Sequence, residues 1–317
     1  MLYKVILHNI SRQGLPDINA IQNPIQRLSV EASLPVWLIE TLVEQNGEAK
    51  TRQIIGSIND APAQAIRVNT VLSTDEAVEQ ALLDEHFTFV KSKVADHAYV
   101  VTGGHVAGSK AYQDGLLTLQ DESAMLPVEA LQITTQVKTV LDAAAAPGGK
   151  TTQIAQYIAD DATITALDIH AHKIRLIEAN AKRLHVSDKI TAQVLDARQT
   201  ANQLTTKFDR ILVDAPCSGF GLLRRKPEIR YDKTLEDVMS LASLQGEILD
   251  SVSQNVADNG MIVYSTCTIL RQENDDVIAR FLSKHTDFEL VPTMTSKALK
   301  SNRQETVLHI YPNDYHT

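Results

Sequence analysis

The chain has 317 residues, of which 44% are hydrophobic, 22% charged and 5% aromatic, and its formal net charge is −9. This apolar fraction excludes a disordered protein, and two cysteines can form neither a disulfide framework nor the paired spacing of a zinc site. We therefore expect two domains without bound metal, in the reducing setting of the cytoplasm. The acidic charge argues at first sight against a nucleic-acid partner, because Lys and Arg make phosphate contacts.

The N-terminal segment has helical character. Residues 1–30 contain a short apolar stretch with helical spacing and then the turn signal Gly-Leu-Pro-Asp, without the cleavage site of a signal peptide. Residues 33–47 predict a helix that has Pro35 in its first turn, ends at Gly47 and uses Trp37 as a core anchor. No apolar run approaches the roughly 20 residues that span a bilayer, so we expect a soluble protein with no membrane partner.

Residues 31–132 predict a small α+β (RRM-like) domain. Thr74 is the expected cap of a helix over 74–85, and strands are expected on both sides of that helix. The predicted strands are residues 65–71, 86–90 and 97–103. The unit ends near residues 116–125, where a connecting helix is expected to begin.

Residues 133–317 predict a doubly wound, Rossmann-like α/β domain. Five apolar runs alternate with segments of helical length such as 150–160 and 171–186, which is typical of a parallel sheet. The five runs are residues 137–145, 162–169, 189–196, 208–216 and 260–267. Ligands of such sheets bind outside the carboxyl ends of the strands, so the residues directly after each run are the candidate site.

Small residues and acids occupy these strand ends. The loop after the first run contains Ala144, Ala145, Ala146, Pro147, Gly148, Gly149 and Lys150. Asp168, Asp196 and Asp214 end the next three runs. A single Asp in such a place is often only a helix cap or a turn residue. A small-residue loop followed by three acids predicts a site for a nucleoside-like cofactor.

The Gly-Gly-Lys-Thr sequence of this loop suggests a rival reading as a nucleotide triphosphatase. The first glycine of a phosphate-binding loop is replaced by Ala144, however, and Pro147 removes an N–H donor. S-adenosylmethionine carries no phosphate, and its cationic sulfonium suits an acidic site. We therefore favour S-adenosylmethionine as the cofactor.

The two cysteines follow the last two strands. Cys217 lies in Pro-Cys-Ser-Gly and Cys267 in Thr-Cys-Thr. A lone intracellular cysteine is usually an inert core residue, but two on the ligand-binding edge point to chemistry. A thiolate that adds to carbon 6 of a pyrimidine makes carbon 5 nucleophilic enough to take a methyl group, and Asp214 is placed to stabilise charge near ring nitrogen 3. The residues alone do not rank the two cysteines.

These motifs resemble the RNA 5-methylcytosine methyltransferases. The matching stretches are LDAAAAPGGKTT, ALDIH, ILVDAPCSGFGLLRRKPEIRY and IVYSTCTILRQEN, with fainter matches in NPIQRLSVEASLPVW, AIRVN and LLTLQDESA. Together they span nearly the whole chain. The likeness is strongest to enzymes that act on small-subunit (16S) ribosomal RNA, which implies an RNA substrate, S-adenosylmethionine as cofactor and a monomer.

The resemblance also implies a role for each candidate residue. For the cofactor, it assigns the methionine moiety to Ala144–Lys150, ribose to Asp168 and the neighbourhood of adenine to Asp196. Asp214 is expected to face the methionine end and the target base. For the reaction, it assigns nucleophilic attack to Cys267 and breakdown of the covalent adduct to Cys217. Ala144 stands where the family often has cysteine, which keeps a small side chain in the loop.

RNA contacts are expected beside the Cys217 loop. The candidates are Arg224, Arg225, Lys226 and Arg230, with Tyr231 available for stacking, although a short basic cluster is often only a solvated face. The family carries an antitermination-factor-like helical RNA-binding domain before the catalytic part. Residues 1–30 look like the last helix and linker of that domain.

Two alternatives remain open besides the triphosphatase. The same chemistry could act on another RNA such as tRNA, or the chain could be a non-catalytic RNA-binding assembly factor. The presence of Cys267, Cys217 and Asp214 together favours an enzyme, because a binding protein needs none of them.

Overall fold

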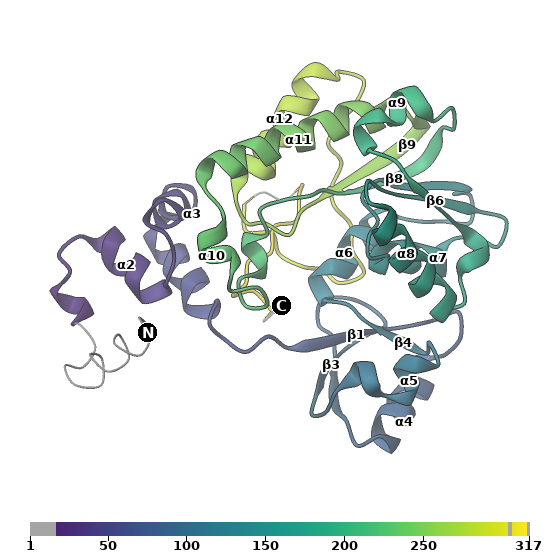
Figure 1. The fold of residues 1–317 in the computed structure, drawn as a ribbon, viewed down its shortest axis with the longest axis horizontal. Coiled ribbons are helices and arrows are strands. Elements are labelled where there is room, and N and C mark those ends of the chain that lie inside the picture. The colour runs from purple at the N-terminus through teal and green to yellow at the C-terminus, as the bar shows by residue number, and fades with distance from the viewer. Residues whose placement is uncertain (1–16, 304–305, 316–317) are drawn as a thin grey trace.

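A computed structural model describes residues 17–303 and 306–315 of the chain. The helix expected within residues 1–16 lies outside the described residues. From the N-terminal side, a helical segment, a small antiparallel sheet and a larger parallel sheet follow one another (Figure 1). The predicted fold class is confirmed by the two sheets described below.

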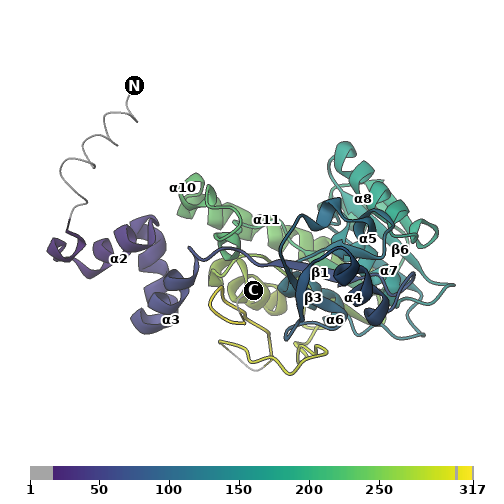
Figure 2. The ribbon, with the colours of Figure 1, turned by 90° about the horizontal axis from the view of Figure 1, so that it is seen from below.

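The helical segment consists of α2 (Pro24–Ala32) and α3 (Val36–Ser57). The Asn23 side chain caps α2 by accepting hydrogen bonds from two backbone N–H groups. Gly47 interrupts the helical geometry with a φ of +75°, as a glycine can, but the chain resumes its helix and continues to Ser57. The prediction that the helix ends at Gly47 was therefore wrong. In Figure 2, α2 and α3 extend to one end of the molecule, away from the small sheet.

This helical segment packs against the domain that contains the larger, parallel sheet. Leu38 and Leu42 of α3 share a buried cluster with Phe220 and Leu223, which follow the Cys217 loop. Trp37 contacts Phe220 edge to face, with ring centroids 5.7 Å apart, but it is only partly buried. Trp37 is thus at the margin of this core and does not anchor its centre.

The small sheet has four antiparallel strands in the order β2-β3-β1-β4. Its elements are β1 (Gln64–Val68), α4 (Asp75–Asp84), β2 (Thr88–Lys91), β3 (Ala98–Thr102), α5 (Lys110–Gln113) and β4 (Leu117–Leu119). Thr74 caps α4 as predicted, accepting a hydrogen bond from the N–H of Ala77. The βαββαβ order with this pairing is the ferredoxin-like, RRM-like arrangement. The strand β4 and the short α5 were not predicted.

The two faces of β1 have different chemistry. Ile66 and Val68 point into the apolar core that α4 and α5 cover. Arg67 and Asn69 alternate with them and bond to the parallel-sheet domain. One strand therefore builds the core of the small domain and also joins the two domains.

The large sheet has five parallel strands in the order β7-β6-β5-β8-β9. The strands are β5 (Thr139–Asp142), β6 (Thr163–Asp168), β7 (Ile190–Val194), β8 (Phe208–Asp214) and β9 (Val256–Ser265). All five predicted strands are present. Successive residues alternate between two apolar layers, with Val140 and Leu212 in one and Leu141 and Val213 in the other.

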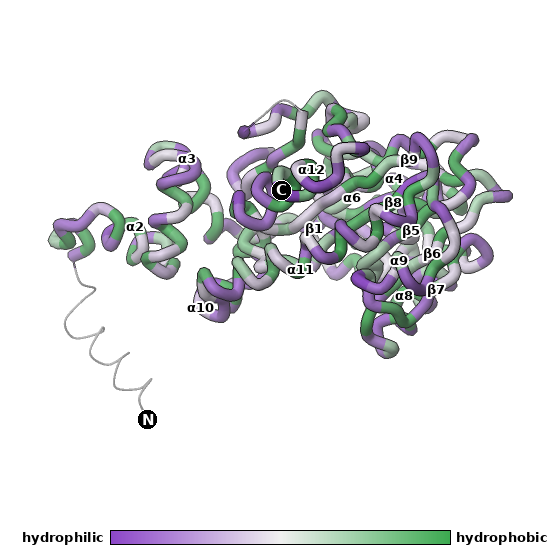
Figure 3. The backbone as a smooth tube through the Cα atoms, turned by 90° about the horizontal axis from the view of Figure 1, so that it is seen from above, coloured by the Kyte–Doolittle hydropathy of each residue, from purple (hydrophilic) through white to green (hydrophobic). Residues whose placement is uncertain are grey.

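Helices cover both faces of this sheet. One layer contains α6 (Glu122–Ala130), α7 (Gly149–Tyr157) and α8 (Ala171–Arg183), and the other contains α11 (Leu235–Ser253) and α12 (Asp275–Lys284). The short helices α9 (Thr200–Gln203) and α10 (Ile229–Asp232) lie in connections. Hydrophilic and hydrophobic residues alternate along α8 and α11 in Figure 3, as expected of helices with one face on a sheet. None of the helices in the described part of the chain has the length and apolar character to cross a membrane.

Candidate functional site

The loop between β5 and α7 presents backbone and small side chains. Gly148 precedes α7 with a φ of +102°, a conformation that favours glycine. A Cβ at this position would lie 3.1 Å from the Cα of Ile177, because α8 packs directly on the loop. The bond between Ala146 and Pro147 is cis. Because the side chains of this loop are small, a ligand can approach its main chain closely.

A cavity of about 220 Å³ lies against this loop. Its lining includes six of the seven predicted loop residues: Ala144, Ala145, Ala146, Pro147, Gly149 and Lys150. Asp142, Asp121 and Asp214 add three acidic side chains to the lining. The cavity is thus small, acidic and bounded by backbone, which suits a cationic cofactor.

Asp142 is a site residue that the sequence reasoning did not single out. Its carboxyl group is buried, and its Oδ2 accepts a hydrogen bond from Thr151 Oγ1 at 2.7 Å. Its Oδ1 has no hydrogen-bond partner among the described residues. Burial raises the pKa of Asp142 to about 6. An unpartnered buried acceptor is costly, and a cationic ligand group in the cavity would satisfy it.

Asp214 joins this cavity to the cysteine loops. Lys150 Nζ donates to Asp214 Oδ2 at 2.7 Å, and Ser265 Oγ donates to Asp214 Oδ1 at 2.7 Å. Ser265 is also the partner of Asp214 in the register of β8 and β9. The carboxylate is therefore fixed on both sides at the point where the two strands end.

The two cysteines meet at this same edge. Parallel pairing of β8 with β9 brings their loops together, and the Sγ atoms of Cys217 and Cys267 lie 3.1 Å apart. The backbone N–H of Cys267 also points at Cys217 Sγ, at an N···S distance of 3.3 Å. Cys267 is exposed and Cys217 is partly buried. The pairing of β8 with β9 thus places both cysteines side by side at the edge of the sheet where ligands were expected.

The two thiols differ in acidity. The hydrogen bond from Cys217 lowers the pKa of Cys267, since it stabilises the thiolate, and Lys150 adds a smaller effect of the same sign. The same hydrogen bond, together with burial, raises the pKa of Cys217 well above its usual value. These directions favour the thiolate at Cys267 and the thiol at Cys217.

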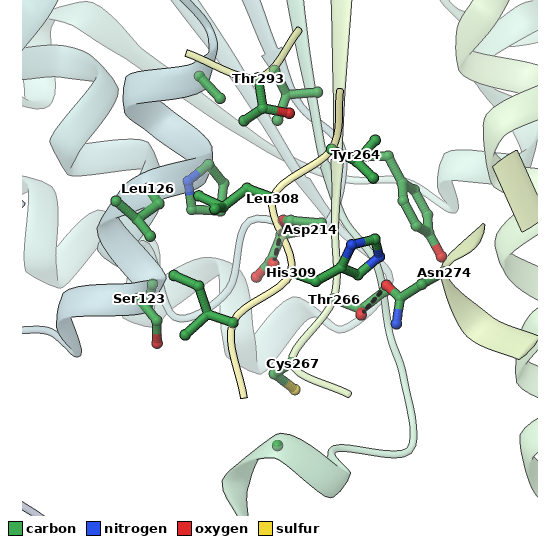
Figure 4. Close-up of a pocket in the computed structure, with 18 of the residues that line it drawn as sticks. Ser123, Leu126, Asp214, Tyr264, Thr266, Cys267, Asn274, Thr293, Leu308 and His309 are labelled. Carbon is green, nitrogen blue, oxygen red and sulfur yellow. Dashed lines mark hydrogen bonds between the residues drawn. The ribbon is translucent and has the colours of Figure 1, made fainter. Parts of the chain in front are cut away.

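A larger cavity of about 410 Å³ opens beside β9 and α6. Asp214, Lys150 and Cys267 line it, together with C-terminal residues 289–293 and 307–312. In Figure 4, Cys267 lies at one end of this cavity and Asp214 lies between it and Tyr264. Asp214 and Lys150 line both cavities, so the two cavities meet at this bonded pair of side chains. The volume is in the range of about 300–1,000 Å³ that is usual for ligand sites.

The two remaining predicted acids lie farther along the sheet edge. Asp168 Oδ1 accepts a hydrogen bond from the N–H of His170 at 2.9 Å, and Asp196 forms a paired contact with the guanidinium of Arg198. Neither acid is among the residues that line the two cavities. In the described part of the chain, no group of three or more His, Cys, Asp or Glu side chains could hold a metal ion.

The predicted basic cluster is not an open patch. Arg224 Nε donates to the carbonyl of Ser57 at 2.8 Å, and Arg225 forms an ion pair with Asp121. Arg230 Nη2 donates to Asn59 Oδ1 at 2.6 Å. These three arginines tie the segment after Cys217 to distant parts of the chain, and their contact with RNA stays a prediction.

The other members of that cluster are exposed. Lys226 lies on the surface, and the Tyr231 side chain is 68% exposed. The arginine partners lie 104 to 171 positions away in the sequence, so spacing along the chain could not reveal them.

Comparison with known proteins gives the family. Residues 129–317, more than half of the chain, match the family described as 16S rRNA methyltransferase RsmB/F, and residues 34–106 match its ferredoxin-like domain. The chain is 37% identical to the probable ribosomal RNA small subunit methyltransferase B of Bacillus subtilis, over 98% of this chain and 70% of that protein. It is 33% identical to ribosomal RNA small subunit methyltransferase B of Photorhabdus laumondii, over 93% of this chain and 67% of that protein.

A solved structure agrees with these matches. The crystal structure of a methyltransferase homologue from Pyrococcus horikoshii superposes with a TM-score of 0.79 at 25% identity, covering 94% of this chain and 96% of that one. The chain belongs to the RsmB/F family of 16S rRNA methyltransferases and depends on S-adenosylmethionine, as its loop after β5 predicted.

Proposed function

We propose that this chain methylates carbon 5 of a cytosine in small-subunit ribosomal RNA through a covalent adduct on Cys267. The observation that carries the proposal is the 3.1 Å contact between Cys217 Sγ and Cys267 Sγ beside Asp214, a residue that lines both cavities. The names of the relatives, which refer to ribosomal RNA of the small subunit, support the choice of RNA.

The residues of the smaller cavity suit S-adenosylmethionine. The unpartnered Oδ1 of buried Asp142 would accept the cationic amino group, and the backbone of Ala144–Lys150 would enclose the methionine part. In this proposal Asp168 binds the ribose of the cofactor, and Asp196 lies near its adenine. When bound, the cofactor supplies an electrophilic methyl group on a cationic sulfur.

Cys267 begins the proposed reaction. Its Sγ forms a bond to carbon 6 of the cytosine, which makes carbon 5 an enamine-like nucleophile that takes the methyl group. The addition places negative charge on ring nitrogen 3, and a proton passed from the Asp214 carboxyl group, which Lys150 and Ser265 hold in place, neutralises that charge. The hydrogen bond from Cys217 to Cys267 supports this order, since it favours the Cys267 thiolate.

Cys217 completes the reaction by helping to remove the carbon 5 proton. As that proton leaves, the bond between Cys267 Sγ and carbon 6 breaks, and the methylated base is released. The hydrogen bond with Cys267 raises the pKa of Cys217, so Cys217 begins the reaction as a thiol. Once Cys267 Sγ is bonded to carbon 6 this hydrogen bond is lost, and Cys217 gives its proton to solvent before it accepts the carbon 5 proton.

The domains divide this work in our proposal. Residues 133–317 carry the chemistry, and residues 31–132 present RNA to it. The exposed Lys226 and Tyr231 are the members of the predicted cluster that we expect to contact RNA. Their segment is held in place by the bonds of Arg224, Arg225 and Arg230 to other parts of the chain. A target base in structured RNA has to leave its stack to enter the larger cavity.

Methyl transfer to purified 16S rRNA, mapped by bisulfite sequencing, tests the proposal. Wild-type protein should protect one or few cytosines, tRNA should not be modified, and Cys267→Ala should lose transfer entirely. Methylation of tRNA alone, or full activity of Cys267→Ala, would contradict the substrate or the mechanism respectively. Retained stabilisation of Cys267→Ala by S-adenosylmethionine in a melting experiment is the control for folding.

A further inference from the structure

Glu273 is a fully buried carboxylate that the reaction above does not use. It ends the short 3-10 turn Arg271–Glu273, which follows the Cys267 loop. Its Oε1 accepts hydrogen bonds from the N–H of Ser218 at 2.8 Å and from Gln245 Nε2 at 3.1 Å, and its Oε2 accepts one from Ser218 Oγ at 2.5 Å. Within the described chain it forms no ion pair with Lys, Arg or His. A buried charge that is held only by neutral donors costs folding free energy, so we expect a functional role of the Glu273 carboxylate.

The partners of Glu273 lie on both sides of Cys217. Ser218 follows Cys217 directly in the chain. Pro216 precedes Cys217 directly. The side-chain amide of Gln245 donates from Nε2 both to Glu273 and to the backbone carbonyl of Pro216, the latter at 2.9 Å. The Cys217 loop is therefore held at both of its ends through one carboxylate.

The same network reaches the Cys267 loop. Ser218 Oγ lies 2.9 Å from Thr268 Oγ1, and Thr268 follows Cys267. Tyr264 Oη donates to the backbone carbonyl of Glu273 at 2.6 Å, which fixes the turn against β9. Ser218, which Glu273 holds in place, thus bonds to the residue after Cys267, and this contact between the two loops helps to set their spacing.

We propose that Glu273 is a positioning residue that holds the Cys217 thiol against Cys267 Sγ. This inference rests on the roles given to the two cysteines under the proposed function. Glu273 acts in two separable ways, by the shape of its hydrogen bonds and by its negative charge.

The charge effect has a direction. The pKa of Cys217 is raised by its bond with Cys267 and by burial, and the negative charge of Glu273 adds to this. A neutral side chain at position 273 would make Cys217 easier to ionise and a weaker base. Glutamine keeps the shape, because its amide oxygen can accept from Ser218 N and Gln245, while its amide NH2 can donate to Ser218 Oγ.

Two variants separate shape from charge. Glu273→Gln keeps the hydrogen-bonding frame and removes the charge, whereas Glu273→Ala removes both. Asp209→Asn is the matched control, because Asp209 also accepts from backbone N–H groups and a hydroxyl, those of Lys138 and Thr139, at the opposite end of β8. Each variant is compared with wild type by urea unfolding and by stabilisation with S-adenosylmethionine.

Alkylation of the cysteines by iodoacetamide, quantified for each by mass spectrometry, reads the charge effect without RNA. We expect Glu273→Gln to raise the ratio of Cys217 to Cys267 alkylation about tenfold, as a change of one pKa unit would. Asp209→Asn should leave that ratio as in wild type. An unchanged ratio in Glu273→Gln would overturn the charge effect, even if the protein proved not to methylate cytosine.

Methyl transfer reads the positioning effect. Glu273→Ala should lower kcat about 100-fold while KM for S-adenosylmethionine changes little, because a misplaced reacting group loses rate rather than binding. Glu273→Gln should retain adduct formation and release the adduct more slowly. Wild-type kcat in folded Glu273→Ala would overturn the positioning role. If Glu273→Ala fails to fold, the test passes to Ser218→Ala, which removes the hydroxyl that bonds to both Glu273 and Thr268. A wild-type kcat in folded Ser218→Ala would then overturn the positioning role.

Discussion

Arg67 of the small antiparallel sheet donates a hydrogen bond from Nη1 to the backbone carbonyl of Gly149 in the cofactor loop, at 2.8 Å. The Arg67 side chain is almost wholly buried, and burial lowers its pKa to about 9. It also bonds to Gln120 and to Thr152 Oγ1. Asn69, on the same face of β1, donates to the carbonyl of Leu184 at 2.9 Å. The orientation of the small domain and the shape of the cofactor loop are thus coupled.

Arg67→Met should weaken both stability and cofactor binding. The substitution leaves the carbonyl of Gly149 and the side chains around it without a donor, so we expect the free energy of unfolding to fall by about 1–3 kcal/mol. The Kd for S-adenosylmethionine should rise, since the first turn of α7 loses its support. Urea unfolding and calorimetric titration measure the two effects.

Arg52→Met is the control for this prediction. Arg52 pairs with Glu48 on the exposed side of α3, where such contacts contribute little. We expect a change within about 0.5 kcal/mol and an unaltered Kd. Equal behaviour of the two variants would show that Arg67 does not couple the domains.

The parallel sheet could be predicted from the sequence because its information is local. Each strand is a short apolar run with an Asp or Cys at its carboxyl end or two residues beyond it, and the rule that ligands bind at the carboxyl ends of strands needs no tertiary contacts. This rule placed Cys217 and Cys267 on one edge of the sheet, and their contact also needed β8 and β9 to be neighbours. Their ranking did not, because it depends on hydrogen bonds and burial that only the folded chain creates.

The arginines and Glu273 were beyond such reasoning. The side chain of Arg230 reaches Asn59, 171 positions away, and Glu273 reaches Ser218 over 55 positions. A cluster of basic residues has the same sequence whether it faces RNA or a carbonyl of its own chain. Asp142 was also missed, although it ends a buried strand just as Asp214 does.

Cys217→Ala should trap the covalent complex. Without its thiol the carbon 5 proton is removed slowly, so the adduct on Cys267 forms and persists. With S-adenosylmethionine present, a protein–RNA band that resists SDS should accumulate. The band should be absent in the double variant that combines Cys217→Ala with Cys267→Ala. Rapid turnover without an adduct in Cys217→Ala would contradict the role given to this thiol.

Gly221→Ala should disable the site without unfolding the protein. A Cβ on Gly221 would lie 2.7 Å from the backbone oxygen of Cys267, which is itself bonded to the N–H of Gly221 at 2.9 Å. The Cys267 loop has to move, and we expect kcat to fall about 100-fold. Gly246→Ala in α11 is the control, because its Cβ meets nothing within 4 Å, and it should raise stability by up to about 1 kcal/mol. Equal kcat in both variants would contradict the prediction.

Cofactor affinity should depend on the protonation of Asp142. Burial raises the pKa of Asp142 to about 6, so below that pH the carboxyl is neutral and attracts a cationic amino group weakly. We expect the Kd for S-adenosylmethionine to increase as the pH falls from 7.5 through 6 to 5, measured by calorimetric titration. Asp142→Asn should bind weakly at every pH and lose this dependence.

The same pKa gives a stability prediction of opposite sign for the cofactor-free protein. An acid whose folded pKa of about 6 exceeds its unfolded value of 3.8 binds its proton more tightly when folded. Its contribution to stability is therefore present below pH 3.8 and is lost as the pH rises to about 6, a loss of about 3 kcal/mol. Asp142→Asn should remove this loss, so its unfolding free energy relative to wild type should grow between pH 4 and 6 and stay constant above. A difference that is flat over that range would show that Asp142 is ionised throughout and leave the pH dependence of cofactor binding to another group.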